Sequence, residues 1–409
     1  MRHPLKYADW SWREYAAAAR CILTGRVRNG PNPDRLATRL AALYASSTVY
    51  PVNFGHTAIR LALDVFRAIE PARTEVVVPA YICPSVVETI AAAGLTAVPA
   101  AVGSDLNLLP SAVQAALTPA TLAVIAPHMF GCPARIGEIE SACRAAGVFL
   151  VDDAAQVVGE RCDNRLLGTF GDVGVVSFAQ SKAVVTGVRG SGGVLVVNNR
   201  DLDTLLRTAW AALPAPRGRL AAFAHFVWNY QWARFTGNSG YYLRRIGETL
   251  GRPDPAPPGP GRIANLDAAI ALAQLARLPR IRERKVKAAR DYQAALARIP
   301  GVGVPQFADG RYLSRIMLSL PPDTHLDMLR EELKRRGIAS RLGYQEPVRA
   351  GQPDDPALAR ARRLLGLPFG GAMATSDIEE ICGALRSALA AAQTDPVERK
   401  QNEPYQTAH

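Results

Sequence analysis

Long apolar runs are missing from the first 30 residues of the sequence, where charged side chains recur at short intervals. Asp9, Arg13 and Glu14 interrupt this segment early. A secretory signal needs an unbroken apolar stretch of roughly 7 to 15 residues, and a membrane-spanning helix needs about 20. We therefore expect neither a signal peptide nor a spanning helix, and no association with a membrane.

Paired cysteines are also missing. The cysteines are scattered, with no Cys-x-x-Cys pair and no histidine nearby at ligand spacing. Zinc sites and disulfide frameworks depend on such spacings, so the sequence favours neither a metal site nor a disulfide-bonded secreted protein. A reducing cytoplasm is the location that this pattern predicts. The residues concerned are Cys21, Cys83, Cys132, Cys143, Cys162 and Cys382.

Acidic residues are fewer than basic ones, which gives a formal net charge of +12. Clustered Lys and Arg can neutralise nucleic-acid phosphates. However, the densest basic run, residues 280–287, contains Glu283 and lies in an expected long helix that continues through Leu296, so a solvated helix face is the simpler interpretation. We expect no nucleic-acid partner. The charge excess suits an anionic substrate.

Apolar runs that alternate with helical stretches are abundant. The chain has 409 residues, 48% of them hydrophobic, which is enough for a large domain and a smaller one. From about residue 52 to residue 200 the alternation predicts an α/β fold with a mostly parallel sheet covered on both faces. Residues 1–50 have a helical pattern. The expected strands are 76–79, 122–125, 148–151, 173–177 and 194–197.

The sequence divides into three parts. Residues 1–262 are expected to form an N-terminal segment and a large domain. Residues 263–393 are expected to form a small α/β domain whose last helix covers residues 376–391. Residues 394–409 are expected to be a disordered polar tail. Residues 209–262 form an insertion that interleaves aromatics with arginines and ends in a stiff Pro/Gly-rich connector. The insertion either rests on a membrane surface, lines a substrate mouth, or packs as extra helices on its own subunit or across a dimer. Aromatic stripes usually pack.

Lys182 is the most informative residue. It follows the apolar run that ends at Ser177 and begins a glycine-rich turn, so its amine is expected to project from a strand end into a cleft. Burial there lowers the pKa of a lysine amine, and a carbonyl can trap the amine as a Schiff base. The alternative is a solvated surface lysine.

Asp152 and Asp153 place a carboxylate at the end of another predicted strand. A pyridinium cofactor needs a lysine on one side and, on the other, a buried carboxylate that keeps its ring nitrogen protonated. Asp153 is the better candidate because the small residues Ala154 and Ala155 let a ring approach. The alternative is that one of the aspartates caps a following helix.

The ordered motifs of the sequence resemble those of the DegT/DnrJ/EryC1/StrS family, the pyridoxal-phosphate (PLP) sugar aminotransferases of the aspartate aminotransferase fold (fold type I). The resemblance runs from about Gly55 to the helix ending near Ala390. Each motif alone is weak, and their order is specific. They are Gly55-His-Thr-Ala58, Pro127-His-Met-Phe-Gly131, Asp153-Ala-Ala-Gln156, Gly168-Thr-Phe-Gly171-Asp172, Ser177-Phe with Lys182, Gly192-Gly193, Asp267-Ala-Ala-Ile with Gln274-Leu275, Gly337-Ile338 and Leu367-Pro368.

The resemblance implies a role for each matching residue. Lys182 would carry the Schiff base with the cofactor and shuttle the proton, and Asp153 would pair with the pyridine nitrogen. Gln156 would form a hydrogen bond near the ring hydroxyl, and Ser177 would hold the phosphate.

Further phosphate contacts are expected at a helix start. The backbone amides of Gly55, His56 and Thr57 would lie there, where unpaired N–H groups and the helix dipole favour an anion. The alternative is a loop glycine followed by ordinary first-turn residues. Ahead of Asp267 the family commonly has an Asn that reaches the partner subunit's phosphate. This chain has Arg262 nearby, which is either a charged phosphate donor or a solvated surface arginine.

Two further features depart from the family pattern. Where the family offers an aromatic residue to stack on the cofactor ring, this chain has Cys83, with Tyr81 two residues earlier. Either Cys83 packs its sulfur on the ring or Tyr81 supplies the aromatic face, unless Cys83 is a buried filler. The turn between Lys182 and Gly193 is longer than usual and lacks a common Glu. Tyr344 stands where the family often has an aromatic near the site, and a surface tyrosine is the alternative.

The sequence thus predicts a PLP-dependent aminotransferase that moves an amino group from glutamate or a similar donor to a keto carbon, expected to belong to a nucleotide-linked sugar. A keto-cyclitol or another natural-product intermediate would use the same residues. Lys182 argues against the dehydrating branch of the family, which tends to carry His there. A non-catalytic regulatory protein that keeps the fold is the rival from another class. A homodimer is expected because such sites draw residues from both subunits.

Overall fold

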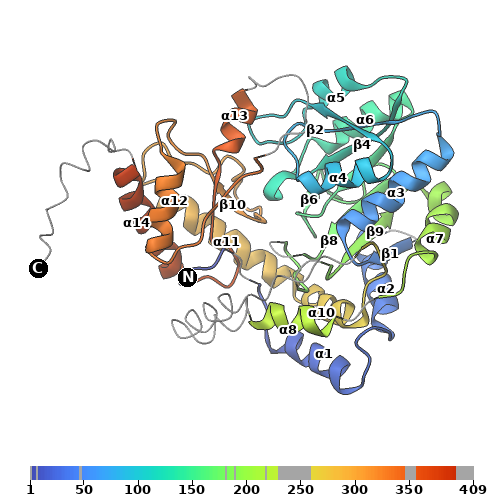
Figure 1. The fold of residues 1–409 in the computed structure, drawn as a ribbon, viewed down its shortest axis with the longest axis horizontal. Helices are drawn as coiled ribbons and strands as arrows, with labels where there is room; N and C mark the ends of the chain where they lie inside the picture. The colour runs from blue at the N-terminus through green and yellow to red at the C-terminus, as the bar shows by residue number, and fades with distance from the viewer. Residues whose placement is uncertain are drawn as a thin grey trace, which may run out of the picture.

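A seven-stranded sheet lies at the centre of the computed structural model, which describes residues 2–5, 8–45, 48–179, 182–187, 190–216, 219–228, 259–345 and 356–392. Its strand order is β1-β9-β8-β5-β4-β2-β3 (Figure 1). Within this sheet β9 runs antiparallel to both of its neighbours, and the remaining strands share one direction. The mostly parallel sheet is therefore confirmed. Its strands are β1 (Thr48–Val52), β2 (Glu75–Pro79), β3 (Thr96–Ala100), β4 (Thr121–Pro127), β5 (Phe149–Asp153), β8 (Val173–Ser177) and β9 (Gly193–Val197).

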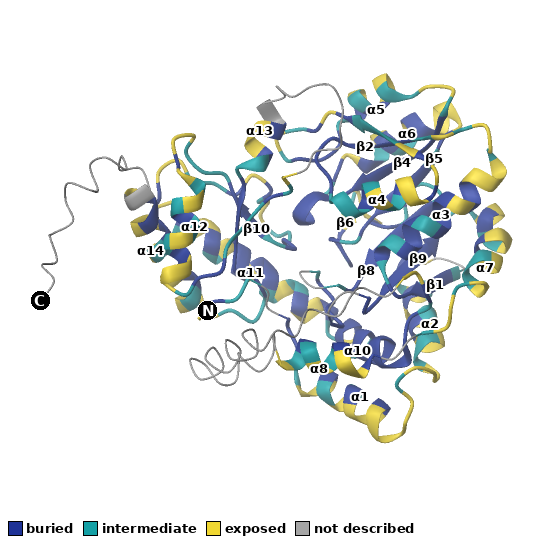
Figure 2. Cartoon of the chain, in the orientation of Figure 1, coloured by how far each residue is buried: buried dark blue, intermediate teal, exposed yellow. Residues whose placement is uncertain are grey.

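Helices cover both faces of this sheet, and the alternation of side chains along each strand explains why. In β2, Val76 and Val78 pack with α3 (Gly55–Ile69) and α4 (Pro84–Ala92), whereas Val77 faces α5 (Pro110–Ala116) and α6 (Ile136–Ala146). At the β1 end, α2 (Asn32–Tyr44) and α10 (Asn265–Leu275) cover the same face as α5 and α6. The strands form a buried layer between exposed helix surfaces (Figure 2).

The edge strands differ from expectation. Residues 1–50 do contain α1 (Trp12–Leu23) and α2, but β1 begins inside that range at Thr48, and β3 has no counterpart among the predicted strands. Each of the two contains a proline, Pro51 in β1 and Pro99 in β3. Proline cannot donate to a central ladder and is tolerated at a sheet edge, which is where both strands lie.

The C-terminal part forms a second, smaller sheet with the order β10-β12-β11. Ile316, Leu318, Leu365 and Leu367 on one face of it pack on α11, α12 and α14. The long helix α11 leads from α10, under the large sheet, to this smaller sheet (Figure 1). The elements here are α11 (Leu278–Leu296), β10 (Ile316–Leu318), α12 (Leu326–Arg335), β11 (Arg341–Leu342), α13 (Pro356–Arg362), β12 (Leu365–Leu367) and α14 (Thr375–Ala392).

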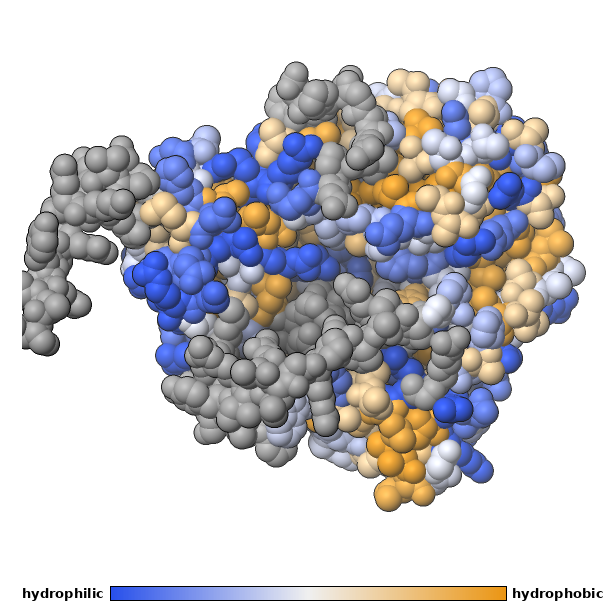
Figure 3. All heavy atoms as spheres, in the orientation of Figure 1, coloured by the Kyte–Doolittle hydropathy of each residue, from blue (hydrophilic) through white to orange (hydrophobic). Residues whose placement is uncertain are grey.

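The described part of the expected insertion packs on its own subunit. Helix α7 (Asp203–Ala211) lies against α3, and α8 (Leu220–Phe226) brings Phe223 and Phe226 to the ring of Trp10, with centroid distances of 6.3 and 5.0 Å. Apolar residues gather on the surface at the tip formed by α1, where Leu23 is exposed (Figure 3). Residues 229–258 of the insertion and the expected tail 394–409 lie outside the described residues.

A small two-stranded sheet and two 3-10 turns lie in the connections between the larger elements. A hairpin joins β6 (Arg161–Cys162) to β7 (Arg165–Leu166) through Asp163 and Asn164, which both have positive φ. The 3-10 turns are η1 (Met129–Gly131) and η2 (Arg200–Leu202).

Across the described ranges, no helix is both long enough and apolar enough to cross a membrane.

Candidate active site

The carboxyl ends of β5 and β8 bring Asp153 and Ser177 to one edge of the large sheet, because the two strands are parallel neighbours. Asp153 is buried, and its Oδ1 accepts a hydrogen bond from the Ala155 N–H at 3.1 Å. Among the described residues this is its only side-chain hydrogen bond, so Oδ2 remains available to a ligand. Burial raises the pKa of the Asp153 carboxyl, against the opposing charge of Lys182. A bound cation at this position would stabilise the ionised form.

Asp152 forms hydrogen bonds within the fold, because its side chain points to the face of β5 opposite that of Asp153. Its Oδ2 accepts from the N–H groups of Gly168 (2.6 Å) and Phe170 (3.0 Å), and its Oδ1 lies 2.8 Å from His128 Nε2. His128 Nδ1 accepts from the Ala134 N–H at 3.0 Å, so Nε2 is the nitrogen that donates to Asp152. Both oxygens of Asp152 are used within the fold. No helix follows Asp153 in residues 154–160, so neither aspartate is a helix cap.

The Lys182 amine is close enough to Asp153 for the two charges to influence each other. Burial, followed by the positive charge of Arg315, lowers the pKa of the Lys182 amine to about 8, although the negative charges of Asp153 and Cys83 act the other way. The backbone of Lys182 is held on both sides. Its N–H donates to the Ala179 carbonyl at 3.2 Å, and its own carbonyl accepts from Lys285 Nζ at 3.4 Å. The Lys182 side chain is partly exposed, and its amine loses a proton more readily than that of a free lysine.

Gln274 of α10 holds the segment that follows Lys182. Its side-chain amide accepts from the Val185 N–H at 3.0 Å and donates to the Val185 carbonyl at 2.6 Å. Trp10 Nε1 donates to the same carbonyl at 2.7 Å. Val185, three residues after the lysine, is therefore held in place by residues far away in the sequence.

A cradle of hydrogen-bond donors lies where α3 begins. A Cβ at Gly55 would lie 3.3 Å from Ser177 Cβ, so the glycine lets the helix start meet the end of β8. Gly193 packs equally closely, since a Cβ there would fall 2.5 Å from the Gly55 nitrogen. The first-turn N–H groups of α3 have no partner within the helix, and the Ser177 hydroxyl lies beside them. Thr57 uses its hydroxyl elsewhere, donating to Asn53 Oδ1 at 2.8 Å.

His56, Ser85 and Cys83 form a polar chain in front of α4. Ser85 Oγ lies 2.8 Å from His56 Nε2 and 3.0 Å from Cys83 Sγ. Burial by itself raises the pKa of the Cys83 thiol. Hydrogen bonds with His56 and Ser85 and the charge of Lys182 outweigh burial and lower this pKa to about 6. Cys83 is also the N-cap residue of α4, where the helix dipole favours a thiolate.

Tyr81 and Tyr344 form an aromatic wall with Phe130. The Tyr344 N–H donates to Tyr81 Oη at 3.0 Å, and the two rings lie 5.2 Å apart. Tyr81 is buried in this contact, whereas Cys83 is only half-buried. Burial raises the pKa of the Tyr344 hydroxyl, and the neighbouring Cys83 raises it further. Tyr344 therefore lies at the site and not on the outer surface.

Gln156 links the large sheet to the smaller one. Its Oε1 accepts from Ser314 Oγ at 2.9 Å, and the Ser314 N–H donates to the Phe130 carbonyl at 2.8 Å. Gly131, with φ of 106°, lies so close that a Cβ would meet the Tyr312 carbonyl oxygen at 2.8 Å. The Pro127–Gly131 motif thus docks the ends of β4 and β5 against the chain before β10.

Arg262 lies beside β1 in its own subunit. It forms a backbone bridge with Val52, and its guanidinium carbon is 5.9 Å from the ring centroid of Trp210. Its Nε is buried without a hydrogen bond within the part of the chain that the structure describes. Sequence reasoning did not single out His128, Ser85, Ser314, Arg315 or Arg341. Only His128 lies inside a matched motif, so the fold was needed to find the others.

These residues fit pyridoxal phosphate. Asp153 offers a free carboxylate oxygen to a protonated ring nitrogen, Lys182 offers an amine whose pKa is lowered, and the cradle at Gly55 and Ser177 offers N–H and hydroxyl donors to a phosphate. The three functions lie at neighbouring strand ends, which is where ligands bind in open α/β sheets.

Comparison with known proteins agrees with this geometry. The chain is 29% identical over 366 residues to dTDP-3-amino-3,4,6-trideoxy-alpha-D-glucose transaminase of Streptomyces venezuelae, covering 87% of this chain and 86% of that protein. It is 26% identical over 383 residues to GDP-perosamine synthase of Vibrio cholerae, covering 90% and 94%. The solved structure of the aminotransferase TlmJ from Streptoalloteichus hindustanus matches with a TM-score of 0.74 at 25% identity, covering 96% and 100%.

The fold is confirmed as fold type I, which is the fold of the structural neighbours. Among them is the Helicobacter pylori aminotransferase PseC, with a TM-score of 0.77 at 14% identity, covering 95% of this chain and 99% of that one. The sequence pattern of the DegT/DnrJ/EryC1/StrS aminotransferase family matches residues 11–386. The chain therefore belongs to the DegT/DnrJ/EryC1/StrS aminotransferase family and is a PLP-dependent aminotransferase, as its motifs predict.

Proposed function

We propose that the protein transfers an amino group from an amino-acid donor, with glutamate as the first candidate, to the keto carbon of a nucleotide-linked sugar. The observation that carries this proposal is the Lys182 amine, whose pKa is lowered by burial, within electrostatic range of Asp153, whose side chain accepts one hydrogen bond, from the Ala155 N–H, among the described residues. The family supplies the reaction class, and the named relatives act on sugars linked to dTDP or GDP. The charge of +12 suits such an anionic substrate.

Lys182 acts as the base and acid of the reaction. With a pKa of about 8, roughly one amine in ten is neutral at pH 7 and able to accept a proton. Its backbone contacts with Ala179 and Lys285 fix the point from which the side chain reaches, so the same amine can return the proton to the substrate. When bound, the cofactor supplies a ring that absorbs carbanion charge.

The remaining residues hold and orient the cofactor. Asp153 would keep the ring nitrogen protonated, Ser177 and the amides of Gly55 and His56 would hold the phosphate, and Gln156 would lie at the ring hydroxyl. Cys83 is the better candidate for contact with the face of the cofactor ring. Its side chain is half-buried and its pKa is influenced by the charge of Lys182, whereas the Tyr81 hydroxyl already accepts a hydrogen bond from the Tyr344 N–H.

The assembly proposed is a homodimer whose partner subunit completes each site. Arg262 is the residue proposed to reach a phosphate across the interface. Its buried Nε has no hydrogen bond within the described ranges, which is compatible with a ligand or a partner supplying one.

The proposal is tested with purified protein loaded with pyridoxal phosphate. Glutamate should bleach the yellow chromophore as the cofactor takes up nitrogen, and a keto sugar linked to dTDP or GDP should restore the colour and yield the amino sugar. Lys182→Met should lack the yellow chromophore altogether. Nitrogen transfer from labelled glutamate is followed by mass spectrometry, with keto-cyclitols as competing acceptors. Cofactor binding without transfer to any acceptor would instead identify a regulatory protein.

A further inference from the structure

Lys285 of α11 is a buried lysine that contacts the segment carrying the reactive amine. Only 4% of the residue is exposed. Its Nζ donates a hydrogen bond to the backbone carbonyl of Lys182 at 3.4 Å. Among the residues that the structure describes, this is the only hydrogen bond of the Lys285 amine. The buried ammonium group is therefore directed at one particular residue, and that residue is Lys182.

The charge of Lys285 is poorly balanced. Within the described ranges, no carboxylate oxygen lies at hydrogen-bond distance from its Nζ. The negative charge that acts on it belongs to Asp9, whose Oδ1 already accepts from Arg284 at 3.1 Å and from Arg277 at 3.4 Å. A buried charge without a close partner is unfavourable, so its presence calls for a reason other than stability.

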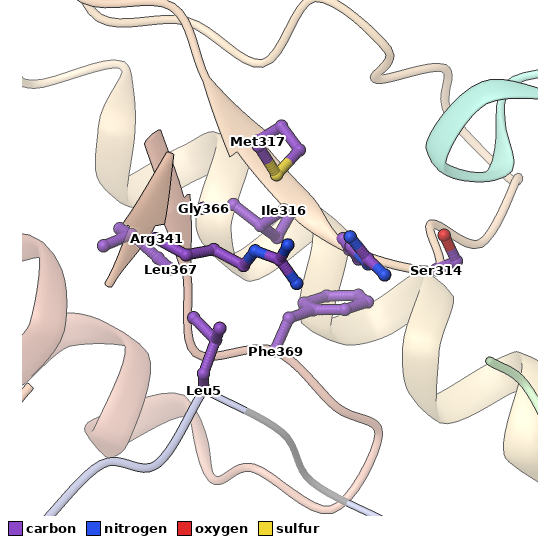
Figure 4. Close-up of a pocket in the computed structure, with 9 residues that line it drawn as sticks. Leu5, Ser314, Ile316, Met317, Arg341, Gly366, Leu367 and Phe369 are labelled. Carbon is purple, nitrogen blue, oxygen red and sulfur yellow. The ribbon is translucent and has the colours of Figure 1, made fainter. Parts of the chain in front are cut away.

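Two aromatic rings enclose the Lys285 amine. The ring centroid of Tyr312 lies 5.8 Å from Lys285 Nζ, and that of Phe369 lies 5.4 Å from it. Phe369 also lines the hollow beside the smaller sheet, together with Leu5 and Ser314 (Figure 4). An aromatic face attracts a cation but offers it no conventional hydrogen-bond acceptor. The Lys182 carbonyl is thus the acceptor that orients the ammonium group.

Buried cations that join elements of the fold have carboxylate partners instead. Arg277 donates to Glu14 at 2.6 Å, and Arg219 donates to Asp267 at 2.8 Å. A charged pair of this kind stabilises packing without involving the active site. Lys285 differs from these arginines because its hydrogen bond goes to the backbone of a site residue.

The contact is well placed to fix the start of the Lys182 side chain. The Lys182 N–H donates to the nearby Ala179 carbonyl at 3.2 Å, which is a local contact within the same excursion of the chain. Gln274 and Trp10 hold Val185, three residues later. Lys285 holds the Lys182 carbonyl from outside the excursion and so restricts the peptide plane next to the reactive residue.

The two amines also act on each other through their charges. Burial lowers the pKa of Lys285 to about 8, although Asp9 raises it, and the positive charge of Lys182 lowers it further. Because a pairwise interaction is mutual, the Lys285 ammonium disfavours a second positive charge on Lys182. The other charged groups that act on Lys182 are Arg315, Asp153 and Cys83.

Resting on the proposed role of Lys182 in proton transfer, we propose that Lys285 is a positioning residue of the reaction, which holds the Lys182 backbone and by its charge keeps the Lys182 amine ready to accept a proton. Lys285 acts through Lys182 and does not touch the substrate. Its loss should therefore slow the proton transfer and leave the affinity for the amino donor unchanged.

The first test uses the cofactor-free protein and needs no turnover. Acetylation with acetic anhydride over a range of pH, followed by peptide mass spectrometry, gives the pH midpoint at which Lys182 reacts. This midpoint should be about 8 in the unmodified protein. It should rise by about 0.5 to 1.5 pH units in Lys285→Met, which removes the charge and the donor, and by less than about 0.5 in Lys285→Arg, which keeps both.

The matched control is Lys287→Met. Lys287 lies on the same helix, two residues away, and 65% of its side chain is exposed. This variant should keep the Lys182 midpoint and the bleaching rate of the unmodified protein, because an exposed charge is screened by water and salt.

The second test follows single-turnover bleaching of the cofactor-loaded protein by glutamate. In Lys285→Met the rate at saturating glutamate should fall about tenfold to a hundredfold, while the half-saturating concentration should change less than about twofold. Glutamate deuterated at the α-carbon should give a larger isotope effect in this variant, because proton transfer then limits the rate. Lys285→Arg should recover most of the rate.

An unchanged midpoint together with an unchanged bleaching rate in Lys285→Met overturns the proposal. A defect in folded Lys285→Arg as large as that in Lys285→Met also overturns it, since shape and not the cation would then matter. If Lys285→Met does not fold, Lys285→Gln replaces it, and its midpoint should rise for the same reason. If no amino acid bleaches the unmodified protein, the proposed transfer is wrong, while the labelling midpoints still decide the role of Lys285.

Discussion

Cys83 shows how the neighbours of one residue set its chemistry. Burial raises the pKa of the thiols of Cys132, Cys143 and Cys382, to about 11, 12 and 12. Cys83 is partly buried too, yet its contacts with His56 and Ser85, its position at the start of α4 and the charge of Lys182 lower its pKa to about 6. We therefore expect Cys83 to be a thiolate at neutral pH, whereas the thiols of Cys132, Cys143 and Cys382 stay protonated.

Selective alkylation checks this state. Only a thiolate reacts with iodoacetamide, so labelling of Cys83 in the cofactor-free protein should rise with pH through a midpoint of about 6 and be complete at neutral pH. The other cysteines should remain unlabelled under the same conditions. Peptide mass spectrometry after timed labelling measures each site.

His56→Asn should move the labelling midpoint of Cys83 upward, because it removes the hydrogen bond that favours the thiolate. Bound cofactor should slow the labelling if the sulfur faces the ring. A midpoint near the ordinary cysteine value of about 8.5 in the unmodified protein would contradict the prediction.

Asp153, Ser177 and Lys182 could be singled out as candidates from the sequence because they lie at or shortly after the ends of strands. Asp153 was preferred to Asp152 on account of its small neighbours, and the structure shows that the loop at Gly168 and His128 occupy both oxygens of Asp152. Arg315 and Arg341 could not be found in this way. They are 26 positions apart, and only the pairing of β10 and β11 with β12 brings them together.

At the scale of the elements, the strands that the sequence predicts are those with continuous apolar runs. β8 matches its expected range of 173–177, and α11 and α14 extend over the expected helices. β1 and β3 were missed, because Pro51 and Pro99 interrupt short segments and the context that tolerates them, a sheet edge, is a tertiary property.

Gly131 lies at a junction between elements where substitution should lower stability. Gly131→Ala would combine a φ of 106° with a Cβ 2.8 to 2.9 Å from backbone atoms of Tyr312, Leu313 and Ser314. We expect a loss of about 1–3 kcal/mol in the free energy of unfolding. Equilibrium unfolding in urea measures it.

The matched control is Gly137→Ala. Gly137 lies in the first turn of α6, and a Cβ there has nothing within 4 Å. This substitution should stabilise the protein by up to about 1 kcal/mol, because alanine favours the helix. Equal effects at the two positions would show that the contact of the Pro127–Gly131 motif with the chain before β10 does not matter.

For the whole molecule, the decisive question is whether a site is completed by a second subunit. Arg262 tests it through hybrid dimers that combine a Lys182→Ala subunit with an Arg262→Ala subunit. If Arg262 acts across the interface, one site of the hybrid carries both defects and the other is intact. Activity should then recover to about half that of the unmodified dimer, although each variant alone is inactive or weak.

Light scattering of the unmodified protein should give a dimer, and the hybrids are separated by differently charged tags. No recovery in a hybrid of confirmed composition would place Arg262 in the site of its own subunit. Recovery in hybrids of two Lys182→Ala subunits would reveal contamination.

The reversed direction of β9 has one more consequence. Ser177 and Gly193 are paired across β8 and β9, so the excursion that carries Lys182 leaves and rejoins the sheet at adjacent positions. Such an excursion can lengthen or shorten over evolutionary time without shifting any strand, since both of its anchors belong to the scaffold. The position of Lys182 can therefore differ between relatives while the cradle at Gly55 and Ser177 keeps its structure.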